Sequence, residues 1–434
     1  MSERPTQEGD PSPRRANILA ILVIIIAVLG VLLWKQGGSG APPSDVAGQA
    51  TEDAGGGARA AQLGHLVEQL DSAWQARDKD RFVAAAGGSP DSHAWAAQTY
   101  HNLVELGVRS FDARFVAEDA AGIRPDGTFA ADVTVSWTPG KSSGLETTRT
   151  KPATVQLVLR PSEQGYDIVS VRPGKDPEPL WLAGELRVER EGPSDLVYVD
   201  PPDPAAAKGR LRPEKLARMG KRARRAVREV VDHKVGSPTI VVPSGASQGA
   251  ALLGQGGLGQ IAAVTTTVDG STSEAAATYV VLNPDVFTGL GKRAAQIVLT
   301  HEVCHALTGA AASSMPLWVA EGFADYVALH DDRLGVRKAA SQILRQVREK
   351  GAPKELPSDD EFGAGRLRLG ATYEEAWLVF ELLHQRAPDE AIVQFYAAVR
   401  DGRRTGRALE KTFGLDVGSL TDLWREYLTE LARS

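Results

Sequence analysis

The sequence predicts an α+β protein in which an N-terminal transmembrane helix precedes a small α+β domain and a larger domain with a small sheet and a mainly helical C-terminal half. Three observations support this class. Apolar residues recur at helical spacing between Leu63 and Trp74. Apolar and polar residues alternate, as in half-buried strands, over 131–137 and 154–159. Helical patterns then fill most of residues 336–432. Helices followed by an antiparallel sheet indicate α+β.

The first element is an uncharged apolar run at residues 18–34, which follows Arg14 and Arg15. Its length is at the short end for a helix that spans a membrane. We therefore expect a cytoplasmic segment at 1–16 and a transmembrane helix at 17–35. Because the basic pair lies in front of the run, the rest of a single-pass cell-membrane protein would be extracytoplasmic. A cleaved signal peptide is the alternative, although no Ala-x-Ala site follows.

The next segments are a stalk and a small domain. Residues 36–59 are rich in Gly, Ala, Ser and Pro, which is typical of a flexible linker. Residues 60–191 form the α+β domain, with a second helix near 95–106 and a further strand at 166–171. Its pattern resembles the cone-shaped fold of the nuclear-transport-factor-2-like superfamily, and we expect it to recognise substrate or act as a spacer. The Pro-rich stretch 192–210 is the next linker.

The third domain spans residues 211–434. It is predicted to begin with a basic helix at 212–234, followed by strands and then by several helices. The expected strands lie at 239–242, 261–268 and 278–282. The expected helices after the central motif lie at 336–350, 372–385, 389–400 and 420–432.

The composition limits the possible functions. Of 434 residues, 42% are hydrophobic and 24% are charged, which is ordinary for a globular protein with a real core. The net charge of −6, from 49 basic and 55 acidic residues, gives no general attraction to nucleic acid. With 1 cysteine the chain cannot form an intrachain disulfide, so core packing must stabilise it.

The segment HEVCH at residues 301–305 carries the most specific chemistry. Residues four apart share one face of a helix, so His301 and His305 can bind one metal ion from the same side. Glu302 is turned aside, where its carboxylate can act as general base on a metal-activated water. The alternative is that both histidines lie on an apolar helical stripe and are core residues bonded to backbone.

A catalytic zinc needs a third protein ligand, and Glu321 is the candidate. Fifteen residues separate it from His305, which is enough to end one helix at Gly309 and start another near Pro316. The two helices can then face each other. Asp325 follows on the same helical face and can accept the outer ring N–H of a zinc-bound histidine. We expect one Zn²⁺ ion, held by the two histidines and Glu321.

The segment WVAEGFA at residues 318–324, after HExxH, resembles the gluzincin zinc metallopeptidases of the peptidase-MA-like superfamily. These include thermolysin-like and aminopeptidase-N-like enzymes and bacterial membrane-anchored relatives. The resemblance covers about residues 210–430 and is specific between roughly 297 and 327. It implies that His301, His305 and Glu321 are zinc ligands and that Glu302 is the general base.

The resemblance also implies two features of substrate binding. The segment ATYEEAW at 371–377 is similar to the place where these enzymes put a tyrosine that steadies the transition-state oxyanion, which here is Tyr373. A tyrosine that merely packs is the alternative. In such folds the edge strand of the sheet can pair with an extended peptide.

One departure from the family pattern concerns specificity. The chain has no Gly-x-Met-Glu-Asn segment, which aminopeptidase-N-like enzymes use to hold a free amine, so an endopeptidase is favoured. We therefore expect a membrane-anchored, extracytoplasmic zinc metallopeptidase that acts on a peptide or protein substrate. The alternatives are a catalytically inactive binding module with a peptidase fold and a zinc amide hydrolase that acts on cell-wall peptides.

Overall fold

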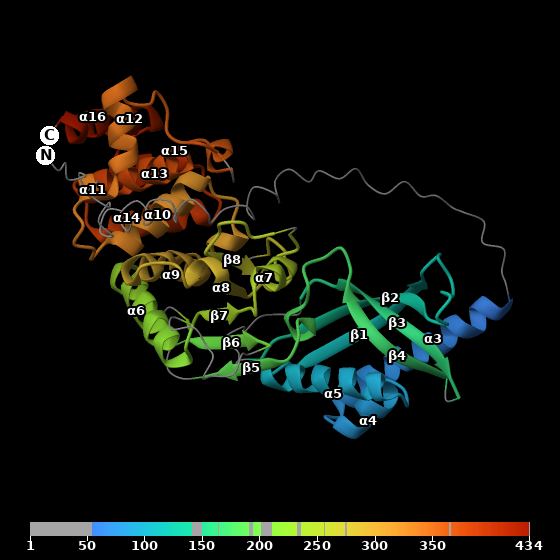
Figure 1. Ribbon diagram of the computed structural model, residues 1–434. Helices are drawn as coiled ribbons and strands as arrows, with labels where there is room; N and C mark the ends of the chain where they lie inside the picture. The colour runs from blue at the N-terminus through green and yellow to red at the C-terminus, as the bar shows by residue number, and fades with distance from the viewer. Residues whose placement is uncertain are drawn as a thin grey trace, which may run out of the picture.

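The computed structural model describes residues 54–140, 150–163, 165–190, 194–200, 211–231, 236–255, 257–273, 276–363 and 366–433. Over these residues the chain forms two units (Figure 1). The N-terminal unit combines helices with one sheet. In the C-terminal unit a second sheet lies under a group of helices. The predicted α+β class is confirmed.

One part of the predicted fold is wrong. Among the described residues no helix is both long and apolar enough to cross a membrane, which contradicts the expected single-pass architecture and cell-membrane location. The longest described helix, α3 (Ala54–Gln75), carries Arg59, Glu68 and Asp71, and only one of its faces is buried. Segments 1–16 and 17–35 lie outside the described residues, as does most of the predicted stalk.

The N-terminal unit begins with three helices. After α3 come α4 (Lys79–Ala85) and α5 (Pro90–Glu105). Asp78 and Ser89 start these two helices, because each side chain accepts a hydrogen bond from the backbone N–H three residues later, at 3.0 and 3.3 Å. The three helices meet around Trp74, Phe82 and Tyr100, whose rings are in edge contact.

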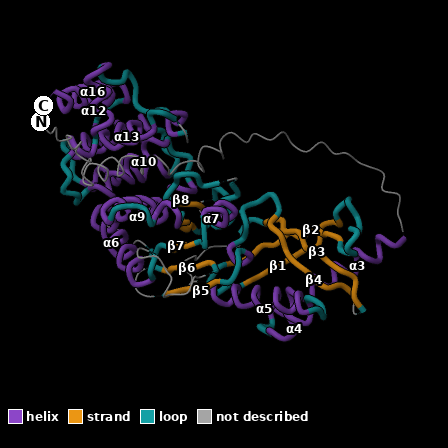
Figure 2. Tube along the Cα trace, in the orientation of Figure 1, coloured by secondary structure: helices purple, strands orange, loops and turns teal. Residues whose placement is uncertain are grey.

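A four-stranded antiparallel sheet completes this unit. Its strands are β1 (Ser110–Glu118), β2 (Phe129–Thr138), β3 (Ala153–Ser162) and β4 (Gly165–Pro173), in that spatial order. The predicted alternation is confirmed over the first part of each predicted segment, since Val133 and Val135 are buried and Thr134 between them is half-buried. Further along, Ser136 and Val158 are buried as well, which breaks the alternation. Figure 2 shows the strands of this sheet and of the second sheet, and among the described residues helices and loops follow β9.

The second sheet has the order β5-β6-β7-β9-β8. Its strands are β5 (Leu186–Glu189), β6 (Asp195–Val199), β7 (Thr239–Val242), β8 (Ala263–Thr267) and β9 (Thr278–Leu282). The three central strands are parallel, whereas β5 and β8 run antiparallel to their neighbours. Strands covered on both faces are continuous apolar runs, as in TIVV at 239–242. β8 is the edge strand next to the metal-motif helix.

Helices α6, α7 and α9 contact this sheet, and most of the described residues after β9 are helical. Their bounds are α6 (Pro213–Val231), α7 (Ala246–Leu252), α8 (Pro284–Phe287), α9 (Lys292–Thr308), α10 (Leu317–Leu329), α11 (Val336–Ala339), α12 (Ser341–Lys350), α13 (Leu369–His384), α14 (Asp389–Arg400), α15 (Thr405–Phe413) and α16 (Val417–Arg433). Short 3₁₀ turns are η3 (Leu180–Leu182), η4 (Ala310–Ala312) and η5 (Asp359–Phe362).

The helices α10 and α13 cross in close contact at a glycine. A Cβ atom built at Gly322 would lie 2.5 Å from the carbonyl oxygen of Ala376 and 2.8 Å from a ring carbon of Phe380. Only a residue without a side chain allows this approach. Since Glu321 precedes Gly322, the crossing also sets the position of that carboxylate.

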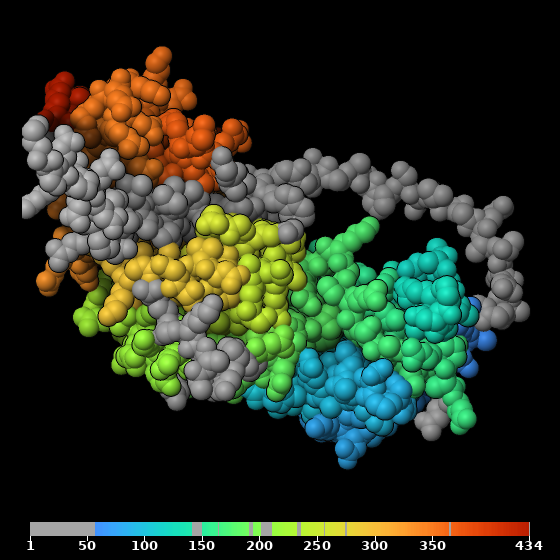
Figure 3. All heavy atoms as spheres, viewed as in Figure 1, coloured from blue at the N-terminus to red at the C-terminus, as the bar shows by residue number. Residues whose placement is uncertain are grey.

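The second sheet joins the two units into one body. Val241 and Val281 belong to the hydrophobic core of the N-terminal unit, whereas their neighbours Ile240 and Val280 belong to the core under the helices. The predicted linker 192–210 therefore contains a strand, β6, that pairs with β5 of the preceding predicted domain. Figure 3 shows the two units packed directly against each other.

Candidate metal centre

The helix α9 carries both motif histidines on a face that is buried in the protein. It ends at Gly309, whose φ of 73° is left-handed, and the Gly309 N–H bonds back to the His305 carbonyl. His301 and His305 are one turn apart and their rings are in edge contact, with centroids 4.6 Å apart. Both are almost fully buried, at 3% and 4% exposed. The predicted helix end at Gly309 is confirmed.

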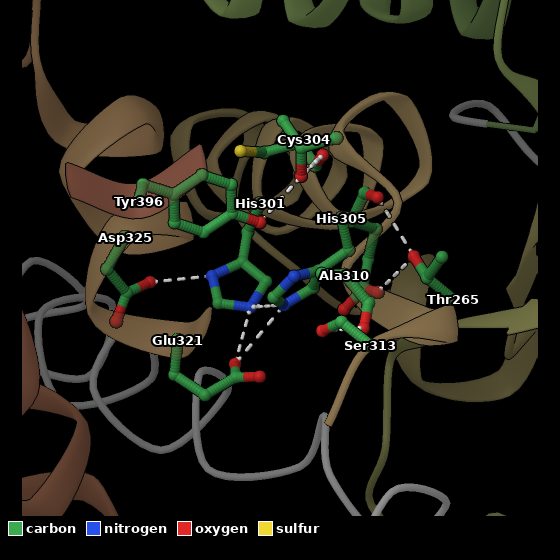
Figure 4. Close-up of polar contacts among 11 residues, drawn as sticks. Thr265, His301, Cys304, His305, Ala310, Ser313, Glu321, Asp325 and Tyr396 are labelled. Carbon is green, nitrogen blue, oxygen red and sulfur yellow. Dashed lines mark hydrogen bonds and ion pairs between the residues drawn. The ribbon is translucent and has the colours of Figure 1, made fainter. Parts of the chain in front are cut away.

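The helix α10 brings two carboxylates against this face. It starts after Pro316, and the Leu317 N–H donates to Asp359 Oδ1 at 2.8 Å, which satisfies one free N–H of the first turn. Glu321 and Asp325 follow one turn apart and lie beside His301 (Figure 4). The helix start predicted near Pro316 is therefore confirmed.

Three ligand atoms converge at one point. His301 Nε2 lies 3.0 Å from His305 Nε2 and 3.0 Å from Glu321 Oε2, and His305 Nε2 lies 3.3 Å from the same carboxylate oxygen. Tetrahedral zinc with bonds of about 2.0–2.1 Å places its ligands roughly 3.3 Å apart, so this spacing suits zinc. Within the described part of the chain, no other three His, Cys, Asp or Glu residues form such a group.

The outer nitrogen of His301 is held by Asp325. Its Nδ1 lies 2.8 Å from Asp325 Oδ1, so the ring donates Nδ1–H to the carboxylate and turns the lone pair of Nε2 to the point of convergence. Although burial alone would lower the pKa of His301, Asp325 and Glu321 raise it well above its usual value. The cluster attracts positive charge, which a metal cation would supply.

The pKa of Glu321 shows the attraction between this carboxylate and the two histidines. Burial favours its neutral form, but the two histidines outweigh burial and lower its pKa to about 2. Glu321 is fully buried and its second oxygen, Oε1, has no hydrogen-bond partner among the described residues. An ionised carboxylate without a full set of partners in the interior is costly unless a cation is bound. These donors therefore fit zinc.

Glu302 lies next to the ligands but faces the edge strand of the sheet. Its Oε2 accepts a hydrogen bond from Thr265 Oγ1 at 2.7 Å, and Oε1 has no partner among the residues described. Burial raises the pKa of Glu302 to about 7, against the opposing effect of the two histidines. Such a carboxylate can accept and return a proton near neutral pH.

Tyr373 comes to the same site from α13. Its ring centroid lies 6.3 Å from that of His301 and 5.3 Å from that of Phe362, which packs on it edge-on. Its hydroxyl is buried, and the described residues offer it no partner. Burial, together with Glu321 and other nearby carboxylates, raises the pKa of Tyr373 well above its usual value, so the hydroxyl stays a donor.

Three other polar residues of this region are not part of the cluster. Cys304, inside the motif, is buried among apolar residues, and burial raises the pKa of its thiol. His384 Nδ1 bonds to the Tyr326 hydroxyl at 2.8 Å, and His330 pairs with Asp389 at 3.6 Å. These two histidines tie together the ends of α10, α13 and α14.

The sequence pattern alone does not identify Thr265 as part of the site. The run Thr265-Thr266-Thr267 indicates a strand, and nothing in its pattern shows which hydroxyl meets Glu302. The signal that could have found it is the parity of the strand, since only alternate residues face α9. Figure 4 shows Thr265 reaching toward α9 from its strand.

A hollow of about 680 Å³ opens at the carboxyl end of α9. Its lining includes Ala306, which follows His305 directly, then Leu307, Thr308 and Gly309, and also Arg400 from α14. The ligands themselves are buried, so this hollow lies beside the cluster and does not contain it. No protein-family model and no curated protein matches this chain, so any functional assignment rests on the geometry of this site.

Proposed function

We propose that this chain is a zinc-dependent hydrolase of peptide bonds, with His301, His305 and Glu321 as zinc ligands and Glu302 as general base. The observation that carries the proposal is the convergence of two imidazole nitrogens and one carboxylate oxygen within 3.3 Å in a buried site. Two histidines and a glutamate are the ligands of catalytic zinc in several hydrolases, and they leave a fourth position for water.

Zinc held there would act as a Lewis acid and lower the pKa of its water toward neutrality. Glu302 takes one proton from the attacking water, so an O–H bond of water breaks as one forms at the Glu302 carboxylate. The water oxygen bonds to the peptide carbonyl carbon. When the C–N bond breaks, Glu302 returns the proton to the leaving nitrogen. Tyr373 donates a hydrogen bond to the developing oxyanion.

The edge of the second sheet supports a peptide as the substrate. Bonds from Asn283 N–H to the Ala262 carbonyl and from Val268 N–H to the Ala277 carbonyl fix the hydrogen-bonding parity of β8 and β9. By this parity Thr265 turns its own N–H and C=O away from β9, to the free edge. An extended peptide can pair with such groups.

Access to this edge requires local movement. Thr265 is 7% exposed, and η4 packs against β8. A peptide that pairs with β8 must therefore displace the segment that covers this strand, which includes η4. The absence of a Gly-x-Met-Glu-Asn segment favours internal bonds of the peptide over its amino terminus.

The first test is metal content. We expect purified residues 54–434 to hold about one zinc per chain by elemental mass spectrometry, and we expect Glu321→Ala to lose it. Cys304→Ala is the matched control, because it changes a buried residue of the same motif outside the cluster and should keep zinc. If the folded wild-type chain takes up no zinc, the metal site is refuted and both histidines are packing residues.

The second test is cleavage. A mixed peptide library should be cut by the zinc-loaded chain, and a chelator should stop the reaction. Glu302→Gln should keep zinc but lose at least about 10²-fold in turnover, because an amide cannot accept the proton. Undiminished cleavage by this variant would refute the role of Glu302, and zinc without any cleavage would favour a binding module.

A further inference from the structure

The two carboxylate oxygens of Glu302 lie in different surroundings, because Thr265 contacts only one of them. Thr265 Oγ1 lies 2.7 Å from Glu302 Oε2 and 2.8 Å from the Glu302 backbone carbonyl oxygen. The other oxygen, Oε1, is buried and has no hydrogen-bond partner among the residues that the structure describes. The hydroxyl of Thr265 therefore holds one oxygen and leaves the other free.

A threonine hydroxyl has one proton and can accept as well as donate. When Glu302 is ionised, the Thr265 O–H donates to Oε2 and shares its one proton with the Glu302 backbone carbonyl oxygen, the weaker acceptor, at 2.8 Å. When Oε1 carries a proton taken from water, Oε2 is still an acceptor, so the same bond persists. The carboxyl group thus keeps its orientation while protons arrive at and leave Oε1.

We propose that Thr265 is a positioning residue for Glu302, which makes Oε1 the oxygen that exchanges protons with the reacting groups. This inference rests on the proposed hydrolase function and adds to it a residue outside the HExxH motif. Thr265 is buried at 7% exposure and lies on an edge strand whose partners are fixed by register. Its side chain therefore has a rigid support, as a positioning residue requires.

The position of Thr265 also links the base to the substrate. The side chain of Thr265 faces α9, whereas its backbone N–H and C=O face the free edge of β8. A peptide that pairs with this edge would therefore hold its backbone against the residue that orients the base. The pairing of a peptide substrate with β8 and the orientation of the Glu302 carboxylate then both depend on Thr265.

The test compares Thr265→Val, which removes the hydroxyl at nearly constant volume, with Thr265→Ser, which restores it. We expect Thr265→Val to lower kcat about 10- to 100-fold with KM and zinc content unchanged, and Thr265→Ser to recover most of the loss. Thr266→Val is the matched control, because this neighbouring hydroxyl bonds at 3.4 Å to the carbonyl of Thr267 and does not contact Glu302.

A second readout tests the contact without metal or substrate. In the metal-free chain, Thr265→Val should lower the urea midpoint less in a Glu302→Ala background than in the wild type, because the hydrogen bond is already gone. Additive midpoint shifts, or a Thr265→Val enzyme with wild-type kcat, would overturn the inference, and so would a serine variant as impaired as valine. A wild-type chain with neither zinc nor cleavage would instead refute the proposed function itself.

Discussion

Tyr373 is either an oxyanion donor or a residue that only packs, and its hydroxyl oxygen is needed for the first role alone. Its hydroxyl is buried near the ligands without a partner among the described residues. If it donates to an oxyanion, Tyr373→Phe should lower kcat by about 10²-fold. The same change removes an unpaired buried polar atom, so the free energy of unfolding should stay equal or rise by up to about 1 kcal/mol.

Measuring both quantities on one variant separates the two roles of Tyr373. Steady-state kinetics on a cleaved peptide gives the first, and urea unfolding gives the second. A phenylalanine variant with full activity would show that the ring only packs against Phe362 and His301. A large loss of stability would show instead that the hydroxyl has a structural partner.

At the scale of elements, the crossing of α10 and α13 determines where Glu321 lies. We expect Gly322→Ala to destabilise the chain by about 1–3 kcal/mol, because the new methyl group meets the Ala376 carbonyl at 2.5 Å. The shift of α10 should also weaken zinc binding. Thermal unfolding and zinc titration measure the two effects.

Gly64 provides the matched control for this substitution. It lies inside α3 and has no atom within 4 Å of a Cβ built on it. Gly64→Ala should therefore be neutral or stabilising by up to about 1 kcal/mol and should leave zinc binding unchanged. If Gly322→Ala behaves in the same way, the two helices do not depend on close approach.

A buried carboxyl on α13 should make stability depend on pH. Burial raises the pKa of Glu374 to about 8, even though the Ile343 N–H donates to it at 2.7 Å and favours the ionised form. Because the folded state then holds a proton that the unfolded state releases above its own pKa, stability falls as pH rises from about 4.5 to about 8.

Glu374→Gln removes the titrating group and keeps an acceptor for Ile343. Relative to wild type, this variant should gain roughly 3–4 kcal/mol between about pH 5 and about pH 8, because each unit of the difference between the folded and unfolded pKa is worth about 1.4 kcal/mol. The free energy of unfolding measured across this pH range tests the expectation. Parallel curves for the two proteins would show that Glu374 is ionised in the fold at neutral pH.

At the scale of the whole molecule, the second sheet makes the two units depend on each other. A fragment that starts at residue 211 lacks β5 and β6 and exposes the face that carries Val241 and Val281. We expect this fragment to be unfolded or aggregated, whereas residues 54–434 should unfold in one cooperative transition. Circular dichroism and calorimetry of both chains decide this. A stable, zinc-binding fragment would show that the C-terminal unit folds alone.

Local patterns account for much of the fold. The strands at 239–242 and 278–282 and the helix at 389–400 agree with the structure to the residue, because burial on both faces or on one helical stripe is visible in the residues themselves. The predicted helix at 336–350 is broken at Ala340, whose ψ of 28° departs from the helix. The strands β5 (LRVE) and β6 (DLVYV) were missed. The first has a charged residue at every second position, and the second lies beside the Pro-rich stretch that was interpreted as a linker.

Part of the candidate site could likewise be predicted from local sequence pattern, and part of it could not. HEVCH alone determined that His301 and His305 share a helical face, and the spacing to Glu321 and Asp325 allowed a facing helix, because helical geometry is local. Only the tertiary structure brought Thr265 to one oxygen of Glu302, placed Tyr373 beside His301, and made β8 the edge strand. The contacts of Thr265 with Glu302 and of Tyr373 with His301 join residues 37 or more positions apart, and chain packing decides such pairings where no periodic pattern can.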